Sequence, residues 1–198
     1  MAILKRPKAF RSPGFRSCGC ARAHFAINNM KPIFTSLLFC FALGASAWGQ
    51  LPKGKDLLKD AILTNAHRAS DITIQRKGEV ASKAKLKPPV KITYVIKTDS
   101  TNIRLGYAAD QIIFNWEQNK GQLRIDGGPA AGRHIDGVGE VPRNLFVTIV
   151  QEVTPERMTL SVNGVQRASW DADFSQVDQQ VRVFTGGAIL TIRSITAE

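Results

Sequence analysis

The chain has 198 residues, three cysteines and a net charge of +11. All 16 acidic residues but only 20 of the 27 basic ones follow residue 48, so the later part of the chain carries a net charge of +4. That part has no cysteine and about 150 residues, which excludes disulfides and zinc–thiolate sites there and suits one domain.

Residues 30–47 have the features of an export signal. Met30-Lys31-Pro32 gives a positive start, an apolar run follows, and Ala45-Ser46-Ala47 fits the A-x-A cleavage pattern. The apolar run is too short to span a bilayer, and no later run reaches that length. We therefore expect an upstream leader over residues 1–29, a signal peptide over 30–47, no membrane anchor, and an exported protein that is periplasmic or extracellular.

Residues 48–70 form a polar lead-in. The apolar side chains between residues 57 and 62 have the spacing of one helix face, yet the segment also suits a strand, so both a short helix and a strand are open. From residue 71 onward apolar and polar side chains alternate, and we expect residues 71–198 to form the folded domain.

Period-two alternation predicts nine to eleven short strands in this domain. The clearest cover residues 90–98, 102–107, 111–117, 122–126, 145–153, 158–162, 165–170, 180–185 and 188–196. Turn residues separate them, and Asn163-Gly164 is the strongest two-residue hairpin signal. Short strands with turns every eight to twelve residues or so indicate an all-β protein, an antiparallel β-sandwich or jelly roll.

Several classes of function find no support in these residues. The basic residues between 76 and 87 have no aromatic residues among them, so we expect no nucleic-acid partner. His134 and Asp136 are a lone pair where a metal site needs three or four ligands. No nucleophile elbow and no phosphate-binding loop occurs. We therefore predict no metal, no cofactor and no catalytic nucleophile.

A set of short sequence phrases extends from residue 90 to the end. They are Lys97 to Leu105, Ile113-Phe114-Asn115-Trp116-Glu117, Leu123-Arg124, the Gly137 to Pro142 loop, the hairpin Val162-Asn163-Gly164-Val165-Gln166-Arg167, and Leu190-Thr191-Ile192-Arg193-Ser194-Ile195. Together they resemble the concanavalin A-like lectin and glucanase sandwich, and the last part is similar to the back half of a galectin or laminin-G-type module. The resemblance implies an exported, non-catalytic, lectin-like module that binds carbohydrate or a glycan-bearing surface.

Two other interpretations stay open. A glycoside hydrolase or lyase of this fold would carry paired acids in an E-x-D-x-x-E strand, and this sequence has no such spacing. The galectin sugar-binding set, His-x-Asn-x-Arg followed by Trp-Gly-x-Glu-x-Arg, is absent as well. A structural sandwich would instead meet another protein with its sheet face. Of these we favour the non-catalytic binding module.

The residues expected to bind the ligand lie on the polar side of three consecutive predicted strands. Unbroken alternation would point Arg104, Asn115, Glu117 and Arg124 away from the apolar side, and His134 in the following Gly-rich loop completes the set. Guanidinium, amide and carboxylate groups supply the donors and acceptors that a sugar's hydroxyls need. The alternative is a solvated face on which Glu117 forms salt bridges with Arg104 or Arg124.

Trp116 is the other candidate, because an exposed aromatic face can stack on a sugar ring. Its position in the period-two alternation argues against that role, since it falls on the same side of the strand as Ile112 and Phe114. We therefore expect Trp116 to be a core residue.

Overall fold

The computed structural model describes residues 54–198. The expected leader, the signal peptide and the first residues of the lead-in lie outside the described residues. Within the described part, no helix is long and apolar enough to cross a membrane.

The described chain forms twelve strands. They are β1 (Lys55–Asp56), β2 (Ile62–Arg68), β3 (Ile72–Leu86), β4 (Val90–Thr98), β5 (Ile103–Gly106), β6 (Gln111–Phe114), β7 (Arg124–Asp126), β8 (Val147–Val153), β9 (Arg157–Val162), β10 (Val165–Asp171), β11 (Gln179–Phe184) and β12 (Leu190–Ala197). The strands β4 to β12 lie within a residue or a few of the predicted ones. In the lead-in, where helix and strand were both open, β1 and β2 are strands.

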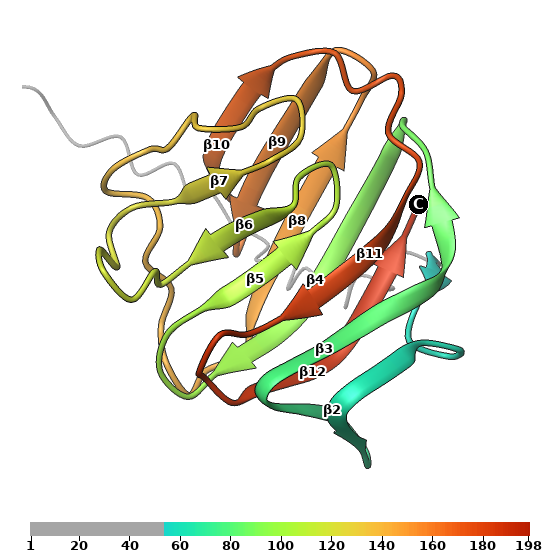
Figure 1. The fold of residues 1–198 in the computed structure, drawn as a ribbon, viewed down its shortest axis with the longest axis vertical. Helices are drawn as coiled ribbons and strands as arrows, with labels where there is room; N and C mark the ends of the chain where they lie inside the picture. The colour runs from blue at the N-terminus through green and yellow to red at the C-terminus, as the bar shows by residue number, and fades with distance from the viewer. Residues whose placement is uncertain (1–53) are drawn as a thin grey trace, which may run out of the picture. The chain divides into compact units, whose positions relative to one another are not determined.

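The strands pair in the order β10-β9-β8-β4-β12-β3-β11-β5-β6-β7, with β1 beside β12 and β2 beside β3. This path makes two layers, because the 15-residue β3 changes partner along its length: Ile72 to Ile74 pair with β12, whereas Glu79 to Leu86 pair with β11. Lys77, at φ +57°, lies where the strand turns from one layer to the other. Figure 1 shows β5, β6 and β7 in front of β8, β9 and β10.

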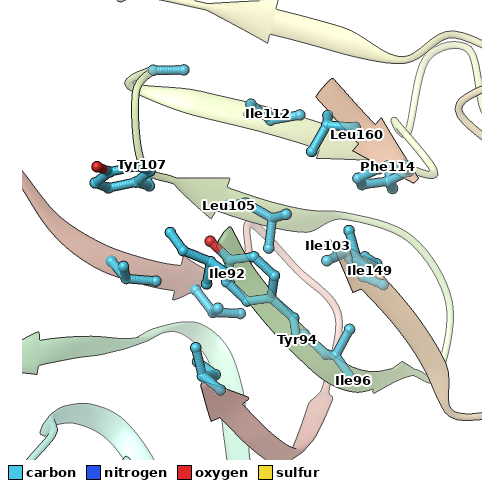
Figure 2. Close-up of a cluster of buried hydrophobic side chains, with 14 of the residues drawn as sticks. Ile92, Tyr94, Ile96, Ile103, Leu105, Tyr107, Ile112, Phe114, Ile149 and Leu160 are labelled. Atoms are coloured by element: carbon cyan, nitrogen blue, oxygen red, sulfur yellow. The ribbon is translucent and has the colours of Figure 1, made fainter. Parts of the chain in front are cut away.

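The core lies between the two layers, and the alternation of the sequence fills it. In β4 every second side chain is buried, and Ile92, Tyr94 and Ile96 have no exposed surface. Figure 2 shows these side chains packed with Leu105 of β5 in the facing layer and with Ile149 of β8, the strand beside β4. Burial of apolar surface on this scale is the main stabilising contribution to such a fold. The prediction of an antiparallel all-β sandwich is confirmed.

A buried polar link joins the layers. The hydroxyl of Tyr94 in β4 donates to Oε1 of Gln151 in β8 (2.9 Å), and Gln151 Nε2 donates to the carbonyl of Tyr107, which follows β5 (2.8 Å). Burial raises the pKa of Tyr94, so its hydroxyl keeps the proton that it donates. Gln151 therefore holds β8 against the end of β5, on the layer that carries the candidate site.

Candidate functional site

Polar side chains gather on the outer face of β5, β6 and β7. Arg104 pairs with Ile113, and Ile113 pairs with Arg124, so these three side chains form one row across the strands on that face. Ile113 is only 1 % exposed although it is not part of the core between the layers. The long arginine side chains beside it therefore cover it with their aliphatic stems.

Hydrogen bonds connect the polar groups of this face into one chain. Arg104 donates to Asn102 Oδ1 through Nε (3.0 Å) and Nη2 (2.8 Å), and to Gln111 Oε1 through Nη1 (2.9 Å). Gln111 Nε2 donates to Asp126 Oδ2 (2.8 Å), and Arg124 Nε donates to both oxygens of Asp126 (3.0 and 2.9 Å). The side chains are thus held in place before any ligand arrives.

We call this surface the polar platform. It consists of Asn102, Arg104, Gln111, Trp116, Glu117, Arg124 and Asp126. Part of each ionic group faces solvent: the side chain of Arg104 is 18 % exposed, that of Arg124 31 % and that of Glu117 45 %.

Asn115 does not belong to the polar platform, and the prediction that it lies on the polar face is wrong. The residue has φ +51°, and its side chain is 1 % exposed. Its Nδ2 donates to the Val141 carbonyl and its Oδ1 accepts from the Val141 N–H, both at 2.9 Å. Asparagine tolerates left-handed φ better than most residues, so it turns the chain inward and pins the loop after β7.

The interpretation of Trp116 as a core residue is wrong for the same reason. The turn at Asn115 breaks the period-two alternation, so parity counted from Ile112 and Phe114 no longer applies to Trp116. The indole is half-buried, it does not join the core cluster, and the guanidinium of Arg124 lies 4.5 Å from its ring centroid. Trp116 therefore supports Arg124 by a cation–π contact.

Glu117 and His134 occupy the borders of the polar platform. Oε1 of Glu117 lies 3.2 Å from Arg104 Nη2, which is the salt bridge that the alternative interpretation of this face expected. His134 is exposed, and its Nδ1 accepts from the backbone N–H of Ile125 in β7 (3.1 Å). The structure thus brings Arg104, Glu117 and Arg124 together and places His134 at the edge of β7.

The electrostatics of the polar platform keep Asp126 ionised. Burial pushes the pKa of Asp126 upward, but the hydrogen bonds from Arg124 and Gln111 and the charges of Arg124 and His134 outweigh it, so the net pKa is lowered. A general acid needs a raised pKa so that it holds a proton at neutral pH. Asp126 is therefore suited to accepting hydrogen bonds rather than to protonating a leaving group.

Gln111 and Asp126 were not among the residues selected from the sequence. Asp126 stands two positions after Arg124, so alternation alone places both on one face. The link through Gln111 depends on the register between β6 and β7, in which Gln111 pairs with Asp126. That register is set by the tertiary structure and has no local signal in the sequence.

A cleft of about 350 Å³ adjoins the polar platform on the side of β11. Its lining includes Gly106 of β5, Arg182 of β11, and Asp110 and Asp178 from the loops that follow β5 and β10. Arg182 lies flat across β5 over Gly106, where a Cβ would come within 2.9 Å of Arg182 Nε. Its Nη2 donates to the Asp110 carbonyl (3.2 Å), so Arg182 forms the wall between the polar platform and the cleft.

Metal binding finds no geometric support in the described residues. Among residues 54–198 no three histidine, cysteine, aspartate or glutamate side chains gather as ligands for an ion. The groups on the polar platform are hydrogen-bond donors and acceptors in a fixed arrangement, and such an arrangement suits a ligand with many hydroxyls.

Comparison with known proteins identifies the fold. No known family model matches the chain, and no curated protein sequence matches it. Among solved structures, a candidate glycosyl hydrolase from Parabacteroides distasonis has 12 % identity and a TM-score of 0.57, covering 74 % of this chain and 98 % of that one. A β-glucanase of Bacillus licheniformis has 10 % identity and a TM-score of 0.54, covering 67 % and 81 %.

A third solved structure is a carbohydrate-binding module, CBM66, from Bacillus subtilis. It has 8 % identity and a TM-score of 0.50, and the match covers 70 % of this chain and 92 % of the module. Identities this low show the fold alone, because one fold hosts many functions. The chain has the concanavalin A-like β-sandwich fold that the sequence resemblance implied.

Proposed function

We propose that this protein is an exported, non-catalytic module that binds carbohydrate through the polar platform. Export rests on the signal-like residues 30–47 of the sequence. Carbohydrate as the ligand class is supported by the fold, which is shared with a carbohydrate-binding module and with a β-glucanase.

One observation carries the proposal. The hydrogen-bonded chain from Arg104 through Gln111 and Asp126 to Arg124 is fixed over a buried side chain and still faces solvent. A rigid surface loses little side-chain entropy on binding, so hydrogen bonds to hydroxyls contribute more of their free energy to affinity. Only Nε of Arg124 donates within residues 54–198, so its Nη groups and the remaining lone pairs of Asp126 are available to a ligand.

Affinity gel electrophoresis tests the proposal. The purified protein is run through gels that contain a panel of polysaccharides, beside the variants Arg104→Ala and Arg124→Ala. A hydrogen bond to a charged group contributes about 1.5–3 kcal/mol, so each variant is expected to weaken binding roughly 10- to 100-fold. Circular dichroism spectra and melting temperatures establish that the variants fold.

Arg157→Ala is the matched control. Arg157 also forms an ion pair with an aspartate, Asp171 (2.6 Å), but it lies on β9 in the other layer. It is expected to leave retardation unchanged. If no polysaccharide retards the protein, or if Arg157→Ala and Arg104→Ala have equal effects, the proposal fails. Release of reducing sugar that stops with Glu117→Gln would replace it with the glycoside hydrolase interpretation.

A further inference from the structure

The two arginines of the polar platform and Arg182 at its border are each neutralised by a carboxylate. Arg104 lies 3.2 Å from Glu117, Arg124 lies 2.9 Å from Asp126, and Arg182 lies 3.7 Å from Glu79. The sum of these six charges is zero. A surface that is rich in arginine is therefore not a positively charged surface here.

The neighbouring cleft has no excess of positive charge either. Its lining residues include Lys85, Asp110 and Asp178 beside Arg182, and the ammonium of Lys87 lies 3.7 Å from Asp178. Since Glu79 already balances Arg182, the two lysines balance the two aspartates. Within residues 54–198 no side chain or backbone group pairs with the carboxylate of Asp110. This carboxylate is an acceptor that is open to a ligand.

The turn that carries Asp110 is held from several sides. Ala108 is fully buried at φ +55°, a strained conformation for a residue with a Cβ, and its N–H is bound by the side chain of Gln179 (3.0 Å). On the opposite side Gly127 and Gly128 approach so closely that a Cβ would lie 2.2 Å from Asp110 Cγ and 2.4 Å from the Ala108 carbonyl oxygen. The position of Asp110 at the cleft is thus fixed by the fold.

A hydroxyl group suits this surface better than an anion does. Each hydroxyl both donates and accepts, so it can bind a carboxylate lone pair and a neighbouring guanidinium N–H at the same time. A uronate or sulfate would have to approach Asp126 and Glu117 or displace them from their arginines. Like charges brought together in a partly desolvated site are unfavourable, and truncating or exchanging one partner of a hydrogen-bonded pair is costly.

We propose that the ligand is an uncharged glycan, an inference that rests on the proposed function. The glycan lies across the polar platform and extends past Arg182 into the cleft, where a hydroxyl donates to Asp110. The spacing of adjacent strands, about 4.8 Å, is close to the repeat of a pyranose chain, so successive sugars can meet successive strands.

Charge selectivity is tested with neutral and acidic polysaccharides at two salt concentrations. The probes are a β-glucan, a xylan and a galactomannan against polygalacturonate and alginate. Raising the salt from about 0.1 M to 1 M shortens the Debye length from about 10 Å to about 3 Å. We expect retardation by at least one neutral polysaccharide that is equal at both concentrations. Retardation by the acidic probes alone, lost at high salt, overturns this inference but leaves carbohydrate binding standing, whereas no retardation by any probe overturns both.

Asp110→Ala tests the cleft. It is expected to weaken binding of the neutral polysaccharide about five-fold, as loss of one hydrogen bond does. Asp60→Ala is the matched control, because Asp60 is also exposed and lies in the loop between β1 and β2. Equal retardation of both variants and the parent protein would remove the cleft from the site. Equal melting temperatures show that the Asp110 variant keeps its fold.

Discussion

Asn115→Ala is expected to destabilise the fold strongly, although the residue lies next to the proposed binding surface. The substitution removes two buried hydrogen bonds of 2.9 Å and leaves both the N–H and the carbonyl of Val141 without their partner. Each buried group left unpaired costs about 1–3 kcal/mol. Alanine at φ +51° adds about 1–2 kcal/mol.

The expected loss is therefore about 3–8 kcal/mol, a large fraction of the 5–15 kcal/mol or so that is typical of a domain. Urea unfolding measures it as a lower midpoint at an unchanged slope. Asn115→Gly separates the two causes, because glycine tolerates the backbone angle but also lacks the hydrogen bonds. Its unfolding free energy should be about 1 kcal/mol higher than that of Asn115→Ala. An unfolding free energy of Asn115→Ala within about 1 kcal/mol of the parent would refute the role assigned to Asn115.

Three further predictions concern the core, the acids and a glycine. Tyr94→Phe leaves Oε1 of Gln151 unpaired in the core and should lower the unfolding free energy by about 1–3 kcal/mol; a neutral result in urea would mean that the link between the layers contributes little. The pKa of Asp126 is lowered in the folded state, so its stabilisation is present above the ordinary value of 3.8 and disappears as the pH falls through the native value. Asp126→Asn should therefore lose less stability than the parent as the pH falls below 3.8, and parallel curves of unfolding free energy against pH would contradict the assignment. Gly127→Ala should destabilise by more than Gly132→Ala, since both have positive φ but a Cβ at Gly127 would meet a side-chain atom at 2.2 Å whereas Gly132 has open space; equal melting temperatures would contradict this.

Much of the fold follows from alternation, because side chains in strands must face one layer or the other. In β4 the predicted inward residues are the buried ones, and both Asn163 and Gly164 have the positive φ of the hairpin that their sequence favours. These features depend on neighbours in the sequence, and such local rules can be read directly.

The errors at the site have a different origin. Alternation gives the correct face for Arg104 and Arg124, but it assumes an unbroken strand, and the turn at Asn115 reverses the expected orientation of Asn115 and Trp116. The angle at Asn115 is stabilised by Val141, 26 residues later in the chain. A single contact at that distance leaves no periodic signal in the sequence, so the inward turn could not be predicted.

The arrangement of charges also depends on long-range contacts. The pairing of β3 with β11 brings Glu79 to Arg182, and the pairing of β5 with β6 brings Glu117, which follows β6, to Arg104. Only the pair of Arg124 and Asp126 is local, because the two residues are two positions apart on β7. Composition gives the net charge of the chain, whereas the strand registers decide where that charge is cancelled.

An NMR titration with a neutral oligosaccharide is the most direct test of binding through the polar platform. The side-chain N–H signals of Arg104, Arg124 and Trp116 and the amide signal of Gln111 are followed as the sugar is added. We expect these signals to shift together and to saturate at one common affinity, while those of Arg157 on β9 stay fixed. Shifts confined to the outer face of β8, β9 and β10, or no saturable shift at the polar platform, would contradict the account.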